Sequence, residues 1–126
     1  MTRVSKIEQD LKKRTKDFAV RIIKFAQYLE KNHGNVGRKT GDQILRSGTG
    51  VYINYRAACR CKSAKDFISK MGTVVEEADE VLGWLDLLVT AGVIKVLLVE
   101  DLLKEANELT AIMTSSRSTA IKNHPL

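Results

Sequence analysis

The chain has 126 residues, of which 44% are hydrophobic, so it can bury one apolar core and is not disordered as a whole. Its single proline, at position 125, and its eight glycines are too few to make the turns of a β-sandwich or barrel. The formal net charge of +6 indicates a polyanionic partner without identifying it. We therefore expect one all-α domain over residues 1–126.

The sequence contains neither a signal peptide nor an apolar run long enough to span a membrane, which indicates a cytoplasmic protein with no membrane partner. Cys59 and Cys61 lie two residues apart in a segment predicted to be helical, so they point in different directions and are expected to be reduced thiols. His33 and His124 fall in a loop and in the tail. No metal or cofactor is expected.

Apolar residues at helical spacing predict a first helix over about residues 10–32 and a second over about 36–61. The stripe of the second helix contains Gly41 and Gly48, with Gly50 close by. Each glycine inside a helix costs about 1 kcal/mol relative to alanine. We therefore expect either a close approach to a neighbouring helix or a kink at these positions.

The third helix is predicted over about residues 63–91, with Ser63 as its N-cap, and the fourth over about 95–121. The third carries a second apolar row beside its main stripe, which indicates an oligomer interface; the alternative is one wide face buried within the chain. The residues assigned to this interface are Ile68, Val75, Leu82 and Trp84. Short connections between the four helices predict an antiparallel up-down-up-down four-helix bundle.

Charge is distributed unevenly along the chain. Residues 1–75 carry a net charge of +11, whereas residues 76–109 carry −7. In an up-down bundle, the first helix begins at the end where the second finishes and the third starts, so two basic clusters meet there. This candidate nucleic-acid-binding patch would contact phosphates; the alternative is a set of solvated faces matched by the acids of the third and fourth helices. Its residues are Lys12, Lys13, Arg14, Lys16, Arg60, Lys62 and Lys65.

Polar side chains interrupt the apolar second helix and face glutamates of the third. They predict a polar network that fixes helix register and oligomeric state, and the alternative is a ligand site around Arg46, Asn54 and Glu77. The residues of the predicted structural polar network are Arg46, Ser47, Asn54, Arg56, Glu77 and Glu80.

We find no pattern typical of an enzyme. A di-metal bundle needs Glu-x-x-His pairs, and no predicted helix interior contains a histidine. The segment GRKTGDQ is too short for a phosphate-binding loop, and Ser47 and Cys59 lack a histidine base in the same predicted layer. We therefore expect a noncatalytic protein.

Three segments, DLKKRTKDFAVRIIKFAQYLEK, QILRSGTGVYINYRAACRCKSAKDFISKM and EEADEVLGWLDLL, carry a family resemblance. Over about residues 10–115 the chain resembles the bacterial four-helix bundle proteins encoded by intervening sequences in large-subunit ribosomal RNA genes. The resemblance implies an antiparallel bundle that assembles as a ring-shaped homopentamer and binds ribosomal RNA or another nucleic acid. The residues that match the family pattern are Arg46, Ser47, Asn54, Tyr55, Arg56, Ser63, Asp66, Phe67, Glu77, Trp84 and Leu85.

Two positions depart from that pattern. Gly50 stands where the family tends to have serine, and Ala57 stands where it tends to have glutamate. The missing carboxylate at Ala57 makes the glutamates of the third helix the expected partners of Arg46 and Arg56.

A weaker resemblance, to the accessory proteins of diversity-generating retroelements, implies a reverse transcriptase as a protein partner in addition to nucleic acid. The sequence thus predicts a basic, oligomeric, RNA-directed binding protein. The alternative is a scaffold or accessory subunit that binds another protein through the third helix.

Overall fold

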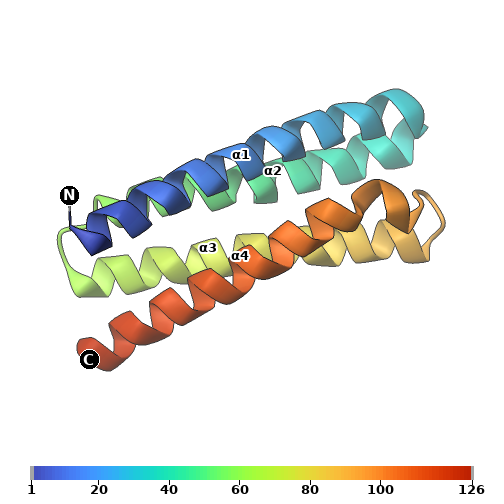
Figure 1. The fold of residues 1–126 in the computed structure, drawn as a ribbon. Helices are drawn as coiled ribbons and strands as arrows, with labels where there is room; N and C mark the ends of the chain where they lie inside the picture. The colour runs from blue at the N-terminus through green and yellow to red at the C-terminus, as the bar shows by residue number, and fades with distance from the viewer. Residues whose placement is uncertain (1, 126) are drawn as a thin grey trace.

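The computed structural model describes residues 2–125, which form four α-helices and no strand. The helices are α1 (Arg3–Asn32), α2 (Gly34–Cys59), α3 (Ala64–Thr90) and α4 (Val96–Asn123). This confirms the all-α prediction; the first and last residues of the predicted domain, 1 and 126, lie outside the described part. The α1–α2 and α3–α4 connections lie at one end of the molecule, and the N-terminus, the α2–α3 connection and the C-terminus lie at the other (Figure 1).

The first helix begins earlier than predicted, at Arg3 instead of residue 10. Thr2 caps it, because its side-chain oxygen accepts a hydrogen bond from the backbone N–H of Ser5 at 3.1 Å. The prediction placed the start just before Leu11, the first residue of the regular apolar stripe. The additional two turns carry exposed apolar side chains, Val4 and Ile7, and therefore lack that signal.

The other boundaries lie within two residues of those predicted. α2 begins at Gly34, whose positive φ of 58° makes the reversal from α1 possible without steric strain. It ends at Cys59 instead of residue 61, because the N–H of Arg60 turns back to the carbonyl of Ala57 at 3.1 Å. The Ser63 cap of α3 is confirmed: its hydroxyl oxygen accepts from the backbone N–H of Asp66 at 3.1 Å.

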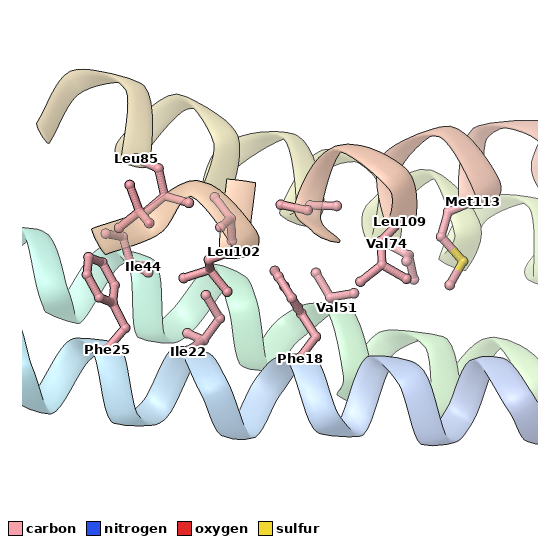
Figure 2. Packing of buried hydrophobic residues seen from close by; sticks show 14 of the residues in the cluster. Phe18, Ile22, Phe25, Ile44, Val51, Val74, Leu85, Leu102, Leu109 and Met113 are labelled. Carbon is pink, nitrogen blue, oxygen red and sulfur yellow. The ribbon is translucent and has the colours of Figure 1, made fainter. Parts of the chain in front are cut away.

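All four helices contribute to one continuous apolar core (Figure 2). Phe18 and Ile22 of α1 lie against the side chains of α2, α3 and α4 in this core. The other labelled residues are Phe25, Ile44, Val51, Val74, Leu85, Leu102, Leu109 and Met113. Among the described residues, no helix is both apolar enough and long enough to cross a lipid bilayer.

The glycines of α2 lie where neighbouring helices approach most closely. A Cβ atom on Gly48 would lie 2.5 Å from the Cγ atoms of Ile22, and one on Gly41 would lie 3.3 Å from the carbonyl oxygen of Ala26. Both contacts are with α1. This confirms the close approach expected from the sequence, and it explains why a helix interior contains residues of such low helical propensity.

Replacing Gly48 with alanine is expected to destabilise the fold. Overpacking a core costs about 1–3 kcal/mol, whereas alanine is favoured over glycine by only ~1 kcal/mol in helix propensity. Gly83→Ala is the matched control, because α3 leaves open space around a Cβ there, and it is expected to stabilise by about 0.5–1 kcal/mol. Urea unfolding of both variants measures the difference; a Gly48→Ala protein as stable as Gly83→Ala would contradict the close packing.

Candidate nucleic-acid interface

The end of the molecule that contains the N-terminus holds a cleft of about 350 Å³, which we call the basic-end cleft. It is lined by the start of α1, the end of α2, the α2–α3 connection, the start of α3 and the end of α4. The segments predicted to bring two basic clusters together therefore do meet (Figure 1). The lining residues are Glu8, Ala58, Cys59, Cys61, Lys62, Ser63, Ala64, Phe67, Ala120 and His124.

The pKa of the Cys59 thiol, which lines this cleft, is raised above its ordinary value. Burial raises the pKa of Cys59, the hydroxyl of Tyr55 lowers it, Glu8 raises it and Lys12 lowers it. Burial likewise raises the pKa of Tyr55. Cys59 is therefore a neutral thiol at physiological pH and is not activated as a nucleophile. Glu8 lines the cleft, and Lys12 lies one helical turn farther along the same face of α1.

Five of the seven predicted cations keep their charge free of any ion pair within residues 2–125. These are Lys12, Lys16, Arg60, Lys62 and Lys65. A sixth, Lys13, pairs with Asp17 at 2.7 Å, which raises the pKa of Lys13 through that hydrogen bond, but both side chains are largely exposed. Such an exposed pair exchanges readily with other anions.

Arg14 is the exception, and we remove it from the predicted patch. Its guanidinium Nε and Nη2 donate to the two carboxylate oxygens of Glu105 at 2.8 and 2.6 Å, and Nη2 also donates to Glu108 at 2.6 Å. The hydrogen bond to Glu105 is the largest cause of the raised pKa of Arg14. Two carboxylates of α4 therefore neutralise this cation inside the chain, which the sequence alone did not reveal.

Arg117 is a cation of this end that the predicted patch did not include. α4 continues past it to Asn123, and its guanidinium Nε donates to the carbonyl oxygen of Ile68 at 3.0 Å. Gly72 makes room for it, because a Cβ there would lie 3.2 Å from Nε. The signal was present in the sequence, since Arg117 follows the buried residues Leu109 and Met113 at a spacing of four.

The predicted polar network forms only in part. The Ser47 hydroxyl donates to Glu80 across the α2–α3 interface at 2.7 Å. Glu77 lies beside it against Gly50, and a Cβ on that glycine would lie 2.9 Å from the Glu77 carboxyl carbon. Burial raises the pKa of Glu77, the charge of Glu80 raises it further and that of Arg46 lowers it.

The remaining members of that network bond within α2 instead. The Asn54 amide donates to the Gly50 carbonyl oxygen at 2.9 Å, and Arg46 donates to Gln43 at 2.8 Å. The guanidinium of Arg56 lies 5.9 Å from the centre of the Tyr52 ring. Asn54 and Arg56 therefore do not join α2 to α3, because residues three or four apart on one helix already satisfy them.

The apolar row assigned to an oligomer interface packs largely within the chain. Ile68 is only 4% exposed, so we remove it from the predicted interface. Val75, Leu82 and Trp84 are half-buried against the core. Within the single chain, these three side chains therefore pack partly against the core and keep an exposed edge.

The opposite end of the molecule has a larger cleft of about 600 Å³ between the α1–α2 and α3–α4 connections. It is mainly apolar, and Lys95 is the one Lys or Arg in its lining. A polyanion is therefore not favoured there. Within the described residues, no group of three or more His, Cys, Asp or Glu side chains is arranged to hold a metal ion.

Comparison with known proteins gives a consistent result. A model of the 23S rRNA-intervening sequence protein family matches residues 8–115. The crystal structure of a protein of unknown function from the S23 ribosomal protein family of Bacteroides thetaiotaomicron superposes with a TM-score of 0.80 and is 31% identical. That match covers 85% of this chain and 97% of the other. No curated protein matches the chain significantly.

Replacing Glu77 with glutamine is expected to stabilise the protein at neutral pH. A carboxyl whose folded pKa is raised favours folding below its unfolded pKa and loses that contribution as the pH rises through the folded pKa. The variant and the parent should therefore unfold alike below about pH 4, where the carboxyl is neutral, and diverge above it. Thermal unfolding midpoints between pH 3 and 8 test this, with the exposed Asp79→Asn as control; an equal effect of both variants would count against the buried position of Glu77.

The ion pair between Arg14 and Glu105 is expected to contribute measurably to the free energy of unfolding. A double-mutant cycle with Arg14→Gln and Glu105→Gln should give an interaction of about 1 kcal/mol, because the contact is bidentate and partly buried. The same cycle at the exposed pair Lys13 and Asp17 should give a much smaller value. Urea unfolding measures both cycles. Equal interaction energies would show that the ion pair between Arg14 and Glu105 is no stronger than an exposed surface pair.

Proposed function

The chain belongs to the 23S rRNA-intervening sequence protein family, and from this premise we propose that it is a noncatalytic protein that binds RNA through the basic end of the bundle. One observation carries the proposal: cations from α1, from the α2–α3 connection and from α3 gather at a single end, and within residues 2–125 they form no ion pair with a carboxylate. They are Lys12, Arg60, Lys62 and Lys65.

The chemistry of this end suits phosphate groups. Lysine and arginine side chains that neutralise phosphates release condensed counterions, so affinity falls steeply as salt concentration rises. Contacts of this kind position a nucleic acid without reading its sequence. Of the acids of α4, Glu105 and Glu108 are engaged by Arg14, so they do not pair with the other cations of the patch.

We further propose that the antiparallel bundle assembles with copies of itself, as a ring-shaped homopentamer. The family resemblance suggests this assembly, and two features of the chain support it. Residues 1–75 are strongly basic while residues 76–109 are acidic, so neighbouring copies can pair opposite charges. Apolar side chains also remain exposed on outer faces, among them Ile53 at 57% and Leu87 at 58%. Repeated patches in one assembly would add avidity.

The alternative role, docking of another protein on the third helix, has less support. It needs a broad uncovered apolar face on α3, and the second apolar row of that helix is buried or half-buried within the chain.

Charge reversal at the basic end is expected to abolish most of the RNA affinity. Lys12→Glu combined with Lys62→Glu should weaken binding at least about tenfold at low salt and reduce the slope of log affinity against log salt by about 1 per lost phosphate contact. Arg38→Glu combined with Lys39→Glu is the matched control, because it changes the net charge equally at the opposite end. Fluorescence anisotropy with a labelled RNA measures both.

Two results would contradict the proposal. One is the absence of RNA binding by the unaltered protein at low salt, and the other is an equal loss in both double variants. The assembly is tested separately by sedimentation velocity: a mass of five subunits supports the ring, and a monomer at micromolar concentration overturns it.

A further inference from the structure

The basic-end cleft combines apolar side chains with hydrogen-bonding groups, whereas a surface that only attracts phosphates needs cations alone. Phe67, Ala58 and Ala120 supply apolar walls from three different helices. Glu8 and Ser63 supply polar atoms, and Lys62 lies at the same cleft. Its volume of about 350 Å³ falls within the range of roughly 300–1,000 Å³ that is typical of sites for small ligands.

The charges around the cleft define what kind of molecule it suits. The helix ends that flank it, residues 3–7 of α1 and 116–123 of α4, lie outside the segment that the family model matches. They contain four cations and no carboxylate. Lys62 lies in the lining of the cleft, and these helix ends add further positive charge to the same end of the molecule. The four cations are Arg3, Lys6, Arg117 and Lys122.

A cleft with an aromatic wall and a hydrogen-bond acceptor, at an end of the molecule rich in cations, matches one nucleotide of a single strand. Single-stranded RNA offers unstacked bases that pack against aromatic side chains, while its backbone follows a positive surface. The bases of a duplex are stacked and paired, so none of them can enter such a cleft unless it is first flipped out. The carboxylate of Glu8 accepts hydrogen bonds and therefore favours a base with an amino group, such as cytosine.

We propose that the basic-end cleft receives one unpaired, amino-bearing base of single-stranded RNA, which contacts Phe67 and donates to Glu8 while Lys12 and Lys62 hold the flanking phosphates. This inference rests on the proposed RNA binding and makes it more specific. It assigns to the cleft the selection of single strands over duplexes, and to Glu8 the selection among bases.

The first experiment compares probes on the full chain. Anisotropy titrations at low salt use labelled 12-nucleotide oligocytidine, oligouridine and an RNA duplex of equal length. Oligocytidine should bind at least about fivefold more tightly than either of the others, because paired bases of the duplex cannot enter the cleft and uracil has no amino group to donate to Glu8. Equal affinity for all three probes would overturn the cleft proposal and leave RNA binding by the basic end intact. Absence of binding to every probe would overturn both.

The second experiment fills the cleft without changing its charge. Ala120→Phe places a large side chain in the cleft and should weaken oligocytidine binding about fivefold or more while leaving duplex binding unchanged. Ala111→Phe introduces the same residue at an exposed position of α4 outside the cleft and serves as control. Thermal unfolding establishes that both variants fold. An Ala120→Phe protein that binds oligocytidine as the control does would contradict the proposal.

A third variant tests the reading of the base. Glu8→Gln retains the shape of the side chain but can donate as well as accept, so the preference for cytosine over uracil should fall to about twofold or less. A purely structural Glu8 would change stability and leave that ratio as it was. An unchanged ratio in a stably folded Glu8→Gln protein would therefore remove Glu8 from the proposal.

Discussion

The close packing of α1 against α2 is the constraint on which the rest of the structure depends. Gly48 and Gly41 let the two helices approach until Ile22 and Ala26 of α1 touch the α2 backbone. A side chain at Gly48 would collide with Ile22, so this contact fixes which turn of α1 faces which turn of α2. That register places the start of α1 beside the end of α2, and thereby brings Lys12 to the same end as Lys62.

Charge is used in two different ways along this scaffold. Arg14 is held by two carboxylates of α4, and this contact joins α1 to a helix with which it packs much less than with α2. At the end of the bundle, the neighbouring cations have no such partners among the described residues. The same basic segment of sequence therefore contributes both to the fold and to the proposed RNA surface. A cation that faces a carboxylate of another helix stabilises the fold, and a cation without one belongs to the proposed surface.

Polar groups between α2 and α3 show a similar division. Ser47 is fully buried and donates to Glu80, while Glu77 is kept beside Gly50 at a cost that its raised pKa reveals. Because a glycine leaves space where most residues would fill it, the carboxyl of Glu77 can approach α2 closely. Asn54 and Arg56 looked equivalent to these residues in the sequence, but their nearest partners lie on their own helix.

The sequence by itself determined the number and kind of the helices, the buried stripes and the cap at Ser63, because helical periodicity and capping depend on residues only a few positions apart. It also placed Lys12 and Lys62 at one end, since the short connections leave little freedom of direction. Only the tertiary structure decided that Arg14 is neutralised, that Ile68 is buried, that Arg117 is held against α3 and that a cleft opens between Glu8 and Ala120. Each of these depends on which side chains meet across helices far apart in the chain, and the spacing along one helix carries no information about that meeting.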